Sequence, residues 1–219
     1  MADTDPVTAL HLQSLFSNPH ALTLFHYTSR TLPAPLLTAC FNLISHTSSA
    51  AYAASSRGWH PAAKLKEMRE AAMQYLLVSK MASAMTAEDL EGFLSYQLVD
   101  EDGVGPVIYI YEIHVASPGK GVGTSLMQCV DAIGRREGKR KAMLTVFVSN
   151  QAAIRFYERC GYEKWDEEYI PPRKRLRSGD KEERKPTYII MAKNLIEADH
   201  AQKEDEEEAG WETDDEDET

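Results

Sequence analysis

A glycine-rich segment of the sequence has the composition of a binding loop for phosphate groups. Residues 119–126 read GKGVGTSL, and they lie between a strand-like apolar run, residues 107–115, and a helical pattern over residues 122–136. Glycine lets the backbone approach a ligand closely, and the first turn of a helix has N–H groups without intrahelical partners. The helix dipole favours negative charge at the same end. The segment therefore predicts a cradle for the pyrophosphate of a nucleotide-like cofactor.

Two better-known phosphate-binding loops do not match this segment. A P-loop requires a lysine between its last glycine and its Ser or Thr, but Thr124 directly follows Gly123. A dinucleotide-binding loop requires Gly-x-Gly-x-x-Gly after a first short strand and an acidic residue about 20 positions later. On the loop alone, a plain strand-to-helix turn remains an alternative.

A second motif follows at residues 144–162, which read LTVFVSNQAAIRFYERCGY. The pattern predicts a strand, then Asn150 as the N-cap of a short helix that carries Tyr157, and then Gly161 just after the helix end. By itself, Asn150 needs no role beyond that of a cap.

One carboxylate stands in an apolar strand, residues 107–115 (VIYIYEIHV). A carboxylate between apolar neighbours is costly to bury unless it is paired or used. Glu112 is therefore either a satisfied buried glutamate or a general base close to the glycine loop. With a period of two, one face of the strand is expected to carry Ile108, Ile110, Glu112 and His114, and the other Tyr109, Tyr111, Ile113 and Val115.

Taken together, the two motifs resemble those of the Gcn5-related N-acetyltransferases. The loop is similar to their Gln/Arg-x-x-Gly-x-Gly/Ala element, with Pro118 in place of the Gln or Arg. Residues 150–162 are similar to their string Asn-x-x-Ala-x-x-Phe-Tyr-x-x-x-Gly-Phe/Tyr. The resemblance implies acetyl-CoA as co-substrate, with Asn150 on its pantetheine arm, and no metal.

Three further strings resemble the N-alpha-acetyltransferase D family. They are Tyr-x-Tyr-Glu-Ile at residues 109–113, LTVF at residues 144–147, and YAASSRGWHPAAKLKEM at residues 52–68. The likeness covers about residues 20–195. Members of that family acetylate the N-terminal Ser of histone H4 and of the other core histone with the same Ser-Gly-Arg-Gly start. The resemblance therefore implies the N-terminal tails of core histones as substrates.

The same resemblance assigns roles to individual residues. Glu112 matches the catalytic glutamate, and either Tyr157 or Tyr188 would protonate the departing thiolate. Arg57 stands where the family pattern has the first of two tryptophans. The cofactor would be bound by Ile113, His114, Val115, Gly119, Lys120, Gly121, Val122, Gly123, Thr124 and Asn150. The peptide would be bound by Tyr52, Trp59, Asp100, Glu101, Tyr111, Thr145 and Tyr188, with the acidic pair receiving the substrate N-terminus and its Arg.

The expected chemistry is direct attack of an amine on the thioester in a ternary complex. An α-amine titrates near 7.7–8, so its deprotonation at neutral pH costs under about 1 kcal/mol, whereas a lysine side chain costs about 4 kcal/mol. One carboxylate, acting through a water, is enough base for an α-amine. Strand N–H groups near residues 113–115 would stabilise the oxyanion. A covalent acetyl-cysteine route is disfavoured because Cys129 lies in an apolar helical stripe without an activating base.

The elements that hold these residues follow from periodicity and turn signals. We expect helices at residues 35–55, from Pro61 to about residue 73, at 122–136 and at 151–160. We expect strands at 22–27, 75–80, 93–99, 107–115, 142–148, 162–169 and 187–193, with a turn around 102–106. Hairpins followed by a βαβ-like half predict an α/β (α+β) fold of the Gcn5-related type, with a mixed, mostly antiparallel sheet of about seven strands flanked by helices on both faces.

Length and charge predict one domain with appended segments. Of the 219 residues, 1–20 form an N-terminal extension and 21–195 the acetyltransferase domain, which includes a flexible basic loop at 171–185. Residues 196–219 hold thirteen acidic residues and one lysine, so the remainder of the chain is close to neutral. This tail is predicted to be disordered because it cannot bury enough apolar surface to fold. It could also steer basic histone tails toward the enzyme.

The remaining signals concern compartment and partners. Three scattered cysteines indicate a reducing compartment, and no secretory signal or membrane-length apolar run is recognised. The string PPRKRLR resembles a nuclear-import signal, so nucleus and cytoplasm are expected. Nucleic-acid binding is not expected, since no aromatics interleave with the basic residues, and a monomer is expected. Two other functions stay open: a lysine or small-amine acetyltransferase of the same fold, and a non-catalytic histone-binding module.

Overall fold

The computed structural model describes residues 22–81, 85–165 and 187–196. The predicted extension at 1–20, the basic loop at 171–185 and the acidic tail beyond its first residue lie outside the described residues. The strands are β1 (Thr23–Thr28), β2 (Gln74–Ser79), β3 (Leu90–Glu101), β4 (Gly105–Val115), β5 (Lys141–Phe147), β6 (Glu163–Lys164) and β7 (Tyr188–Asn194). The helices are α2 (Ala34–Ala54), α3 (Pro61–Glu67), α4 (Val122–Arg136) and α5 (Gln151–Arg159), with a short 3₁₀ turn η1 (Ala87–Asp89).

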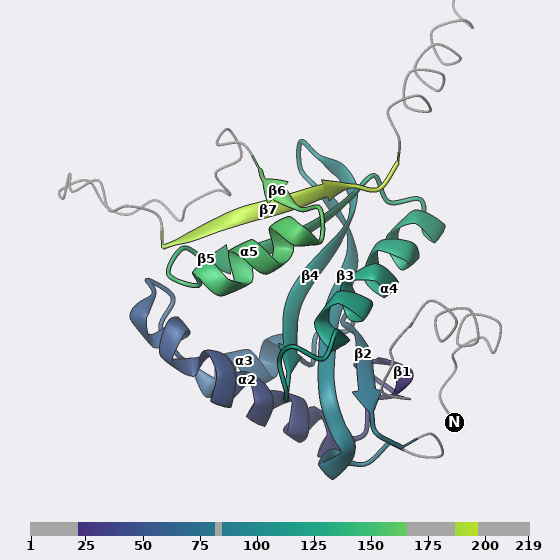
Figure 1. Ribbon diagram of the computed structural model, residues 1–219, viewed down its shortest axis with the longest axis vertical. Coiled ribbons are helices and arrows are strands. Elements are labelled where there is room, and N and C mark those ends of the chain that lie inside the picture. The colour runs from purple at the N-terminus through teal and green to yellow at the C-terminus, as the bar shows by residue number, and fades with distance from the viewer. Residues whose placement is uncertain (1–21, 82–84, 166–186, 197–219) are drawn as a thin grey trace, which may run out of the picture.

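The strands form one sheet in the order β1-β2-β3-β4-β5-β7-β6 (Figure 1). Among the described strands, only β4 and β5 run parallel, and α4 connects them as the crossover helix; the other described neighbours in the sheet are antiparallel. This arrangement confirms the predicted fold, a mixed and mostly antiparallel seven-stranded sheet.

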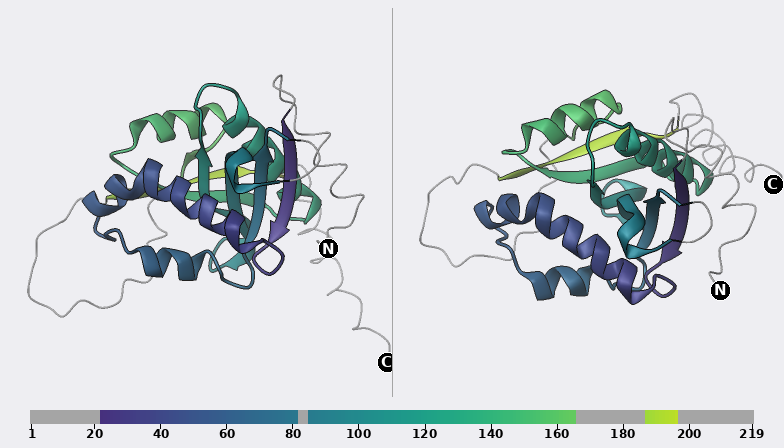
Figure 2. Two further views of the ribbon diagram at one scale, coloured as in Figure 1. Left: turned by 90° about the horizontal axis from the view of Figure 1, so that it is seen from below. Right: turned by 60° about the horizontal axis from the view of Figure 1, so that its bottom comes forward.

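Helices cover both faces of the sheet, as Figure 2 shows from two further sides. The alternation along β2 divides the core: Tyr75 and Leu77 pack in a cluster with α2, whereas Leu76 and Val78 pack in a cluster with α4. The second cluster also contains Tyr157 of α5. Helices α2 and α3 thus cover one face of the central strands, and α4 and α5 cover the other.

Each long helix buries the face that its sequence pattern predicts. In α2 the buried residues are Leu36, Leu37, Cys40 and Ile44, which recur at helical spacing. In α4 the apolar stripe from Val122 to Ile133 is buried, Cys129 included, and burial raises the pKa of that thiol to about 12. Gly134 lies at the end of this stripe. A larger residue at this position would clash with the side chains of Ile108 and Leu195.

Two predicted elements are shorter than expected. The helix predicted to reach residue 73 ends at Glu67, because the following amides of Arg69 and Glu70 bond three residues back and the chain turns into β2. The strand predicted at 162–169 is only β6, two residues long, and residues 166–169 lie outside the described part of the chain. No helix among the described residues is long and apolar enough to span a membrane.

Candidate active site

The parallel strands β4 and β5 pair over only part of their length. Their ladder runs from Val107 opposite Lys141 to Ile110 opposite Leu144. Beyond this point β4 continues to Val115 and β5 to Phe147 without further pairing between them. The β5-facing side of residues 113–115, which were predicted to bind the cofactor through their backbone, therefore lies outside the ladder and can serve a ligand.

A β-bulge in β4 corrects the predicted alternation of its side chains. Two consecutive residues of β3 pair with residues 110 and 112 of β4, so Tyr111 is an inserted residue. Before the bulge, Ile108 and Ile110 join the cluster with α4. After it, Glu112 and His114 contact α2 and α3, while residues 113 and 115 pack against the α4 cluster. The prediction that Ile108, Ile110, Glu112 and His114 share one face was wrong.

Three donors surround the buried carboxylate of Glu112, which is only 7% exposed. Its Oε1 accepts hydrogen bonds from the Tyr52 hydroxyl of α2 and from Lys64 Nζ of α3, both at 2.7 Å. Its Oε2 lies 2.6 Å from Nε2 of His114. The glutamate is thus paired as a buried charge must be.

These contacts keep Glu112 ionised. Burial by itself raises the pKa of this carboxyl, but the hydrogen bond from His114, the charge that its ring carries when protonated, and the charge and hydrogen bond of Lys64 outweigh burial and lower the pKa to about 2. The pKa of Lys64 is raised because the attraction of Glu112 outweighs burial. Burial also raises the pKa of Tyr52, so its hydroxyl remains a donor at neutral pH.

The predicted phosphate cradle forms at the start of α4. Gly119 and Gly121 have φ of 88° and 75°, the left-handed conformation that glycine adopts most readily. Gly121 is the N-cap of α4, and no side chain caps the helix. The first amides of α4 therefore have no capping side chain and point toward the loop. Lys120 of this loop lies 3.8 Å from the buried carboxylate of Glu91.

Asn150 and Tyr157 lie at opposite ends of α5. Asn150 caps the helix, its Oδ1 accepting from the amide of Ala153 at 3.1 Å. The cap uses only the oxygen, so the Nδ2 group can still donate to a ligand. Burial raises the pKa of Tyr157, and the charge of Glu112 raises it further. Tyr157 therefore lies within electrostatic reach of Glu112, although the two residues come from opposite faces of the sheet.

The predicted peptide-binding residues line the face of the sheet beside α2 and α3. Tyr52 packs against Trp59 and Phe147, with ring centroids 5.5 and 5.0 Å away. Tyr109, which was not predicted, joins two predicted residues: its hydroxyl lies 2.6 Å from Thr145 Oγ1, and its ring lies 5.6 Å from that of Tyr111. Four predicted residues thus lie in two groups on one face of the sheet. Tyr52 and Trp59 form the first group with Phe147, and Tyr111 and Thr145 form the second with Tyr109.

The loop between α2 and α3 touches the start of β7. The Arg57 guanidinium lies over the Tyr188 ring at 5.3 Å, and Ser56 Oγ lies 3.1 Å from Thr187 Oγ1. The position where the family pattern has a tryptophan therefore carries a cation stacked on a predicted substrate-binding tyrosine.

The predicted acidic pair lies at the end of β3, away from Glu112. Asp100 and Glu101 pair with Pro106 and Gly105 across the hairpin, and Asp102 follows in the turn. Glu101 contributes to the raised pKa of Tyr109 and of Tyr111, which is due first to burial. Glu101 therefore lies at the rim of the aromatic face, whereas alternation along β3 directs the side chain of Asp100 to the other side of the sheet.

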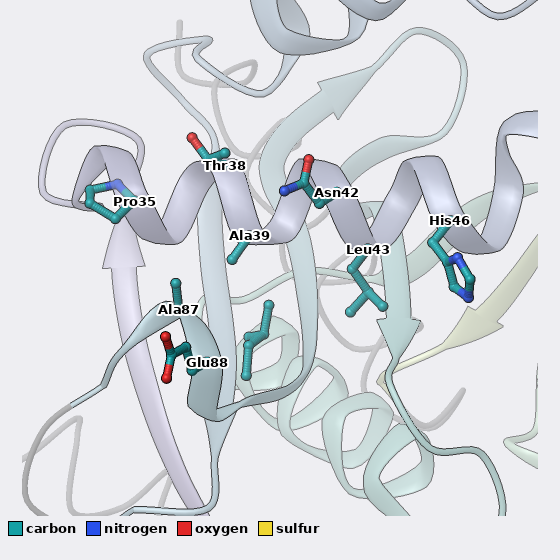
Figure 3. Close-up of a pocket in the computed structure, with 9 residues that line it drawn as sticks. Pro35, Thr38, Ala39, Asn42, Leu43, His46, Ala87 and Glu88 are labelled. Carbon is teal, nitrogen blue, oxygen red and sulfur yellow. The ribbon is translucent and has the colours of Figure 1, made fainter.

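A pocket of about 420 Å³ lies between α2 and η1 (Figure 3). Its lining includes Asn42, His46 and Glu88 and none of the predicted site residues. Among the residues that the structure describes, no cluster of three or more His, Cys, Asp or Glu side chains could hold a metal ion.

Sequence reasoning missed the side chains that hold Glu112. Lys64 was part of a family string but had no assigned role, and Thr47 was not singled out. His114 was predicted to act through its backbone alone, whereas its ring contacts Glu112 and Thr47. The sequence contained no signal for this role of Lys64, because its 8% exposure is set by the tertiary structure, where a buried ammonium requires a buried anion.

The chain is similar to known acetyltransferases in sequence and in structure. The model of the acetyltransferase (GNAT) family matches residues 45–162. N-alpha-acetyltransferase 40 of Saccharomyces cerevisiae is 32% identical over 148 residues, which cover 58% of this chain and 51% of that protein. The chain thus matches only about half the length of this relative.

Two solved structures share the fold. The structure of the NatC complex bound to Gag peptide and CoA has a TM-score of 0.52 and 18% identity, covering 80% of this chain and 99% of that one. Ard1 from Thermoplasma volcanium also has a TM-score of 0.52 and 18% identity, covering 81% and 99% of the two chains. At 18% sequence identity, the two similarities establish the fold of the chain alone.

Proposed function

This chain belongs to the acetyltransferase (GNAT) family, and on this premise we propose that it transfers acetyl from acetyl-CoA to the N-terminal α-amine of proteins. The observation that carries the proposal is an ionised Glu112 at the place where β4 and β5 separate, on the strand that leads into the glycine loop. The similarity to an N-alpha-acetyltransferase supports the α-amine as acceptor.

The residues present suit acetyl-CoA, which supplies the acetyl group as a thioester. Residues 119–124 offer main-chain donors, with Gly119 and Gly121 at positive φ. The helix that follows begins without a side-chain cap, and both features suit a pyrophosphate. The predicted pantetheine partners are the β5-facing backbone of residues 113–115 and the Nδ2 group of Asn150. The same strand amides would stabilise the oxyanion that develops during transfer.

Glu112 is proposed to accept the proton that the amine loses as its N–C bond to the acetyl group forms. An α-amine is easily deprotonated, at a cost under about 1 kcal/mol near neutral pH. A weakly basic carboxylate such as Glu112 therefore suits an α-amine better than a lysine side chain, which costs about 4 kcal/mol.

Tyr157 is the proposed general acid for the departing thiolate, in preference to Tyr188. Its raised pKa keeps the phenol protonated at neutral pH, and Glu112 and Tyr52 are among its charged or polar neighbours. Tyr188 instead has its ring covered by Arg57, at the outer edge of the aromatic face. We assign Tyr188 to the peptide.

The proposed substrates are N-terminal tails of core histones that begin Ser-Gly-Arg-Gly. Support comes from the resemblance to the N-alpha-acetyltransferase D family and from the acidic hairpin beside the aromatic face, which would receive a substrate Arg. We further propose that the enzyme acts as a monomer in nucleus and cytoplasm, on the basis of that resemblance and the string PPRKRLR.

The test is acetyl transfer from acetyl-CoA to three matched peptides, followed by mass spectrometry of the product. The first begins Ser-Gly-Arg-Gly with a free amine and contains a lysine further along, the second has the same sequence with its N-terminus blocked, and the third has Ala at the Arg position. We expect one acetyl group on the first peptide, at its N-terminus, none on the second although it contains lysine, and slower transfer to the third.

Each alternative gives a distinct result in the same assay. A lysine acetyltransferase would modify the blocked peptide as well as the free one. A non-catalytic histone-binding module would retain the peptides without transferring acetyl to any of them. Equal rates for the first and third peptides would overturn the proposed role of the substrate Arg.

A further inference from the structure

The imidazole of His114 is fixed by contacts on both nitrogens and on one ring face. Nε2 lies 2.6 Å from Glu112 Oε2, and Nδ1 lies 2.6 Å from Thr47 Oγ1 of α2. Phe93 of β3 stacks on the ring, with centroids 5.6 Å apart and planes inclined by 29°. His114 is 8% exposed, whereas Thr47 is exposed to solvent.

A count of hydrogens assigns the tautomer of the ring. An ionised carboxylate only accepts hydrogen bonds, so Nε2 must carry a hydrogen and donate it to Glu112. The state of Nδ1 then depends on the charge of the ring. In the neutral ring Nδ1 accepts from the Thr47 hydroxyl, and in the charged ring Nδ1 donates to it.

Thr47 can serve both states because its hydroxyl has a second partner. Thr47 Oγ1 lies 2.7 Å from the carbonyl oxygen of Leu43, one helical turn earlier. When the ring is neutral, the single hydroxyl hydrogen points to Nδ1; when the ring is charged, that hydrogen points to Leu43 and the oxygen accepts from Nδ1. Both ring nitrogens of His114 can therefore stay hydrogen-bonded in either charge state, and only the bond from Thr47 to Leu43 is lost when the ring is neutral.

We propose that His114, held by Thr47, is a positioning residue that sets the basicity of Glu112. A neutral ring orients the carboxylate by one hydrogen bond and leaves Lys64 as its positive partner. A charged ring adds a second positive charge 2.6 Å from Oε2, and this makes Glu112 a poorer proton acceptor. Uptake of a proton by His114 thus slows acetyl transfer. The proposal rests on the proposed function of Glu112.

Other titratable groups surround this pair, but none of them occupies the contact between His114 and Glu112. Lys64 is shared between Glu112 and Glu67, at 2.7 and 2.5 Å. Tyrosines 52, 75 and 157 all have raised pKa values, first through burial, and stay neutral near pH 7. The titratable groups that interact with Glu112 include Tyr52 of α2, Lys64 of α3, Tyr75 of β2 and Tyr157 of α5. Glu67 of α3 contacts Lys64, and Cys40 of α2 interacts with Tyr75.

The first test is independent of acetyl transfer. Nitrogen NMR of protein labelled in its histidine rings reports which nitrogen carries the hydrogen, and the His114 signals are those lost in His114→Gln. We expect a neutral ring protonated on Nε2 that becomes charged as the pH is lowered. A neutral ring protonated on Nδ1 would overturn the assignment, whether or not the protein proves to be an acetyltransferase.

The second test is the pH dependence of kcat in His114→Gln relative to the unaltered enzyme. Glutamine can donate to Glu112 but does not titrate, and dividing the two profiles cancels the titration of the substrate amine. We expect kcat of the variant to be lower than that of the unaltered enzyme at high pH. The ratio of the two values should rise at least about threefold as the pH is lowered, since protonation of the His114 ring inhibits only the unaltered enzyme. A ratio that does not change with pH would refute the tuning role.

Thr47 provides a matched pair of variants. Thr47→Val keeps the shape of the side chain but removes the oxygen that a charged ring needs, so we expect the NMR titration of His114 to move to lower pH. Thr47→Ser keeps the hydroxyl and should restore the original titration. Equal titrations in the valine and serine variants would show that Thr47 does not serve the charged ring.

Discussion

Replacing Glu112 by glutamine tests the buried charge and the proposed base in one substitution. Glutamine imitates the protonated carboxyl, and its oxygen can still accept from Tyr52 and Lys64. Its amide group faces Nε2 of His114, which can accept from it only if the ring hydrogen moves to Nδ1, and Lys64 keeps only Glu67 as an anionic partner. We therefore expect both stability and turnover to fall.

The size of the stability loss follows from the pKa of Glu112. A value of about 2 in place of 4.5 corresponds to about 3 kcal/mol that favours the ionised form in the folded protein. Because the folded-state pKa is the lower one, this contribution is fully present above about pH 4.5 and is lost as the pH falls toward 2. The variant should be about 3 kcal/mol less stable at pH 7, and the difference should shrink below about pH 4.5.

The assays are urea denaturation between pH 3 and 7, steady-state kinetics with a Ser-Gly-Arg-Gly peptide, and calorimetric binding of CoA. We expect turnover to fall at least tenfold, since general-base catalysis contributes about 10²–10⁴-fold. CoA affinity should change little, because the glycine loop does not contact Glu112 through any bond described above. Near-normal turnover would reassign the base, and an unchanged free energy of unfolding would refute the stabilising role of the charge.

The control is Glu67→Gln, which removes a carboxylate from the same Lys64 but leaves Glu112 intact. Turnover of this variant should stay within about threefold of that of the unaltered enzyme, because the proposed general base, Glu112, is retained. A loss as large as that of Glu112→Gln would mean that the effect comes from Lys64 and not from a base at position 112.

A double substitution and a single substitution test the substrate side, and two truncations test the chain end. Replacing Asp100 and Glu101 by Asn and Gln should raise KM for Ser-Gly-Arg-Gly peptides about tenfold or more, since a charged hydrogen bond contributes about 1.5–3 kcal/mol; unchanged selectivity against a peptide with Ala at the Arg position would rule out the pair as Arg receptor. Arg57→Ala should lower KM for the same peptide about two- to fivefold, because an exposed cation–π contact of about 0.5–1 kcal/mol no longer competes for the Tyr188 ring; a raised KM would show instead that Arg57 helps to hold the peptide. Truncation after Ile196 should leave thermal unfolding unchanged, whereas truncation after Asn194 also removes Leu195, which is 6% exposed, at a cost of about 2–5 kcal/mol. If the acidic tail steers substrates, the shorter enzyme should react more slowly at 0.01 M salt and equally fast at 0.15 M, since the Debye length falls from about 30 to 8 Å; a loss of rate that is equal at both would contradict steering.

Local patterns in the sequence were sufficient for most elements of the fold. The helix at residues 122–136 has the bounds that were predicted, because its apolar stripe and the glycine turn before it are signals within the segment itself. The end of the helix that begins at Pro61 was mispredicted, because the chain turns after Glu67, where the amides of Arg69 and Glu70 bond three residues back before β2 begins. The sequence motifs also indicated the acetyltransferase family, which the family match confirms.

The surroundings of Glu112 depend on contacts between distant parts of the chain. Tyr52 lies 60 residues from Glu112 in the sequence, and Lys64 lies 48 residues from it. The residue pattern of β4 therefore cannot indicate either partner. The bulge at Tyr111 exists only in the register of β4 against β3, and it turns Glu112 and His114 toward α2 and α3.

The sequence by itself determined which residues form the sheet, the glycine loop and the helix that follows it, because periodicity and backbone conformation act over a few residues. Only the tertiary structure decided which way Glu112 faces and which groups surround it. A shift of one residue in strand register reverses the side of the sheet, and register is set by pairing with a neighbouring strand, not by the strand's own sequence.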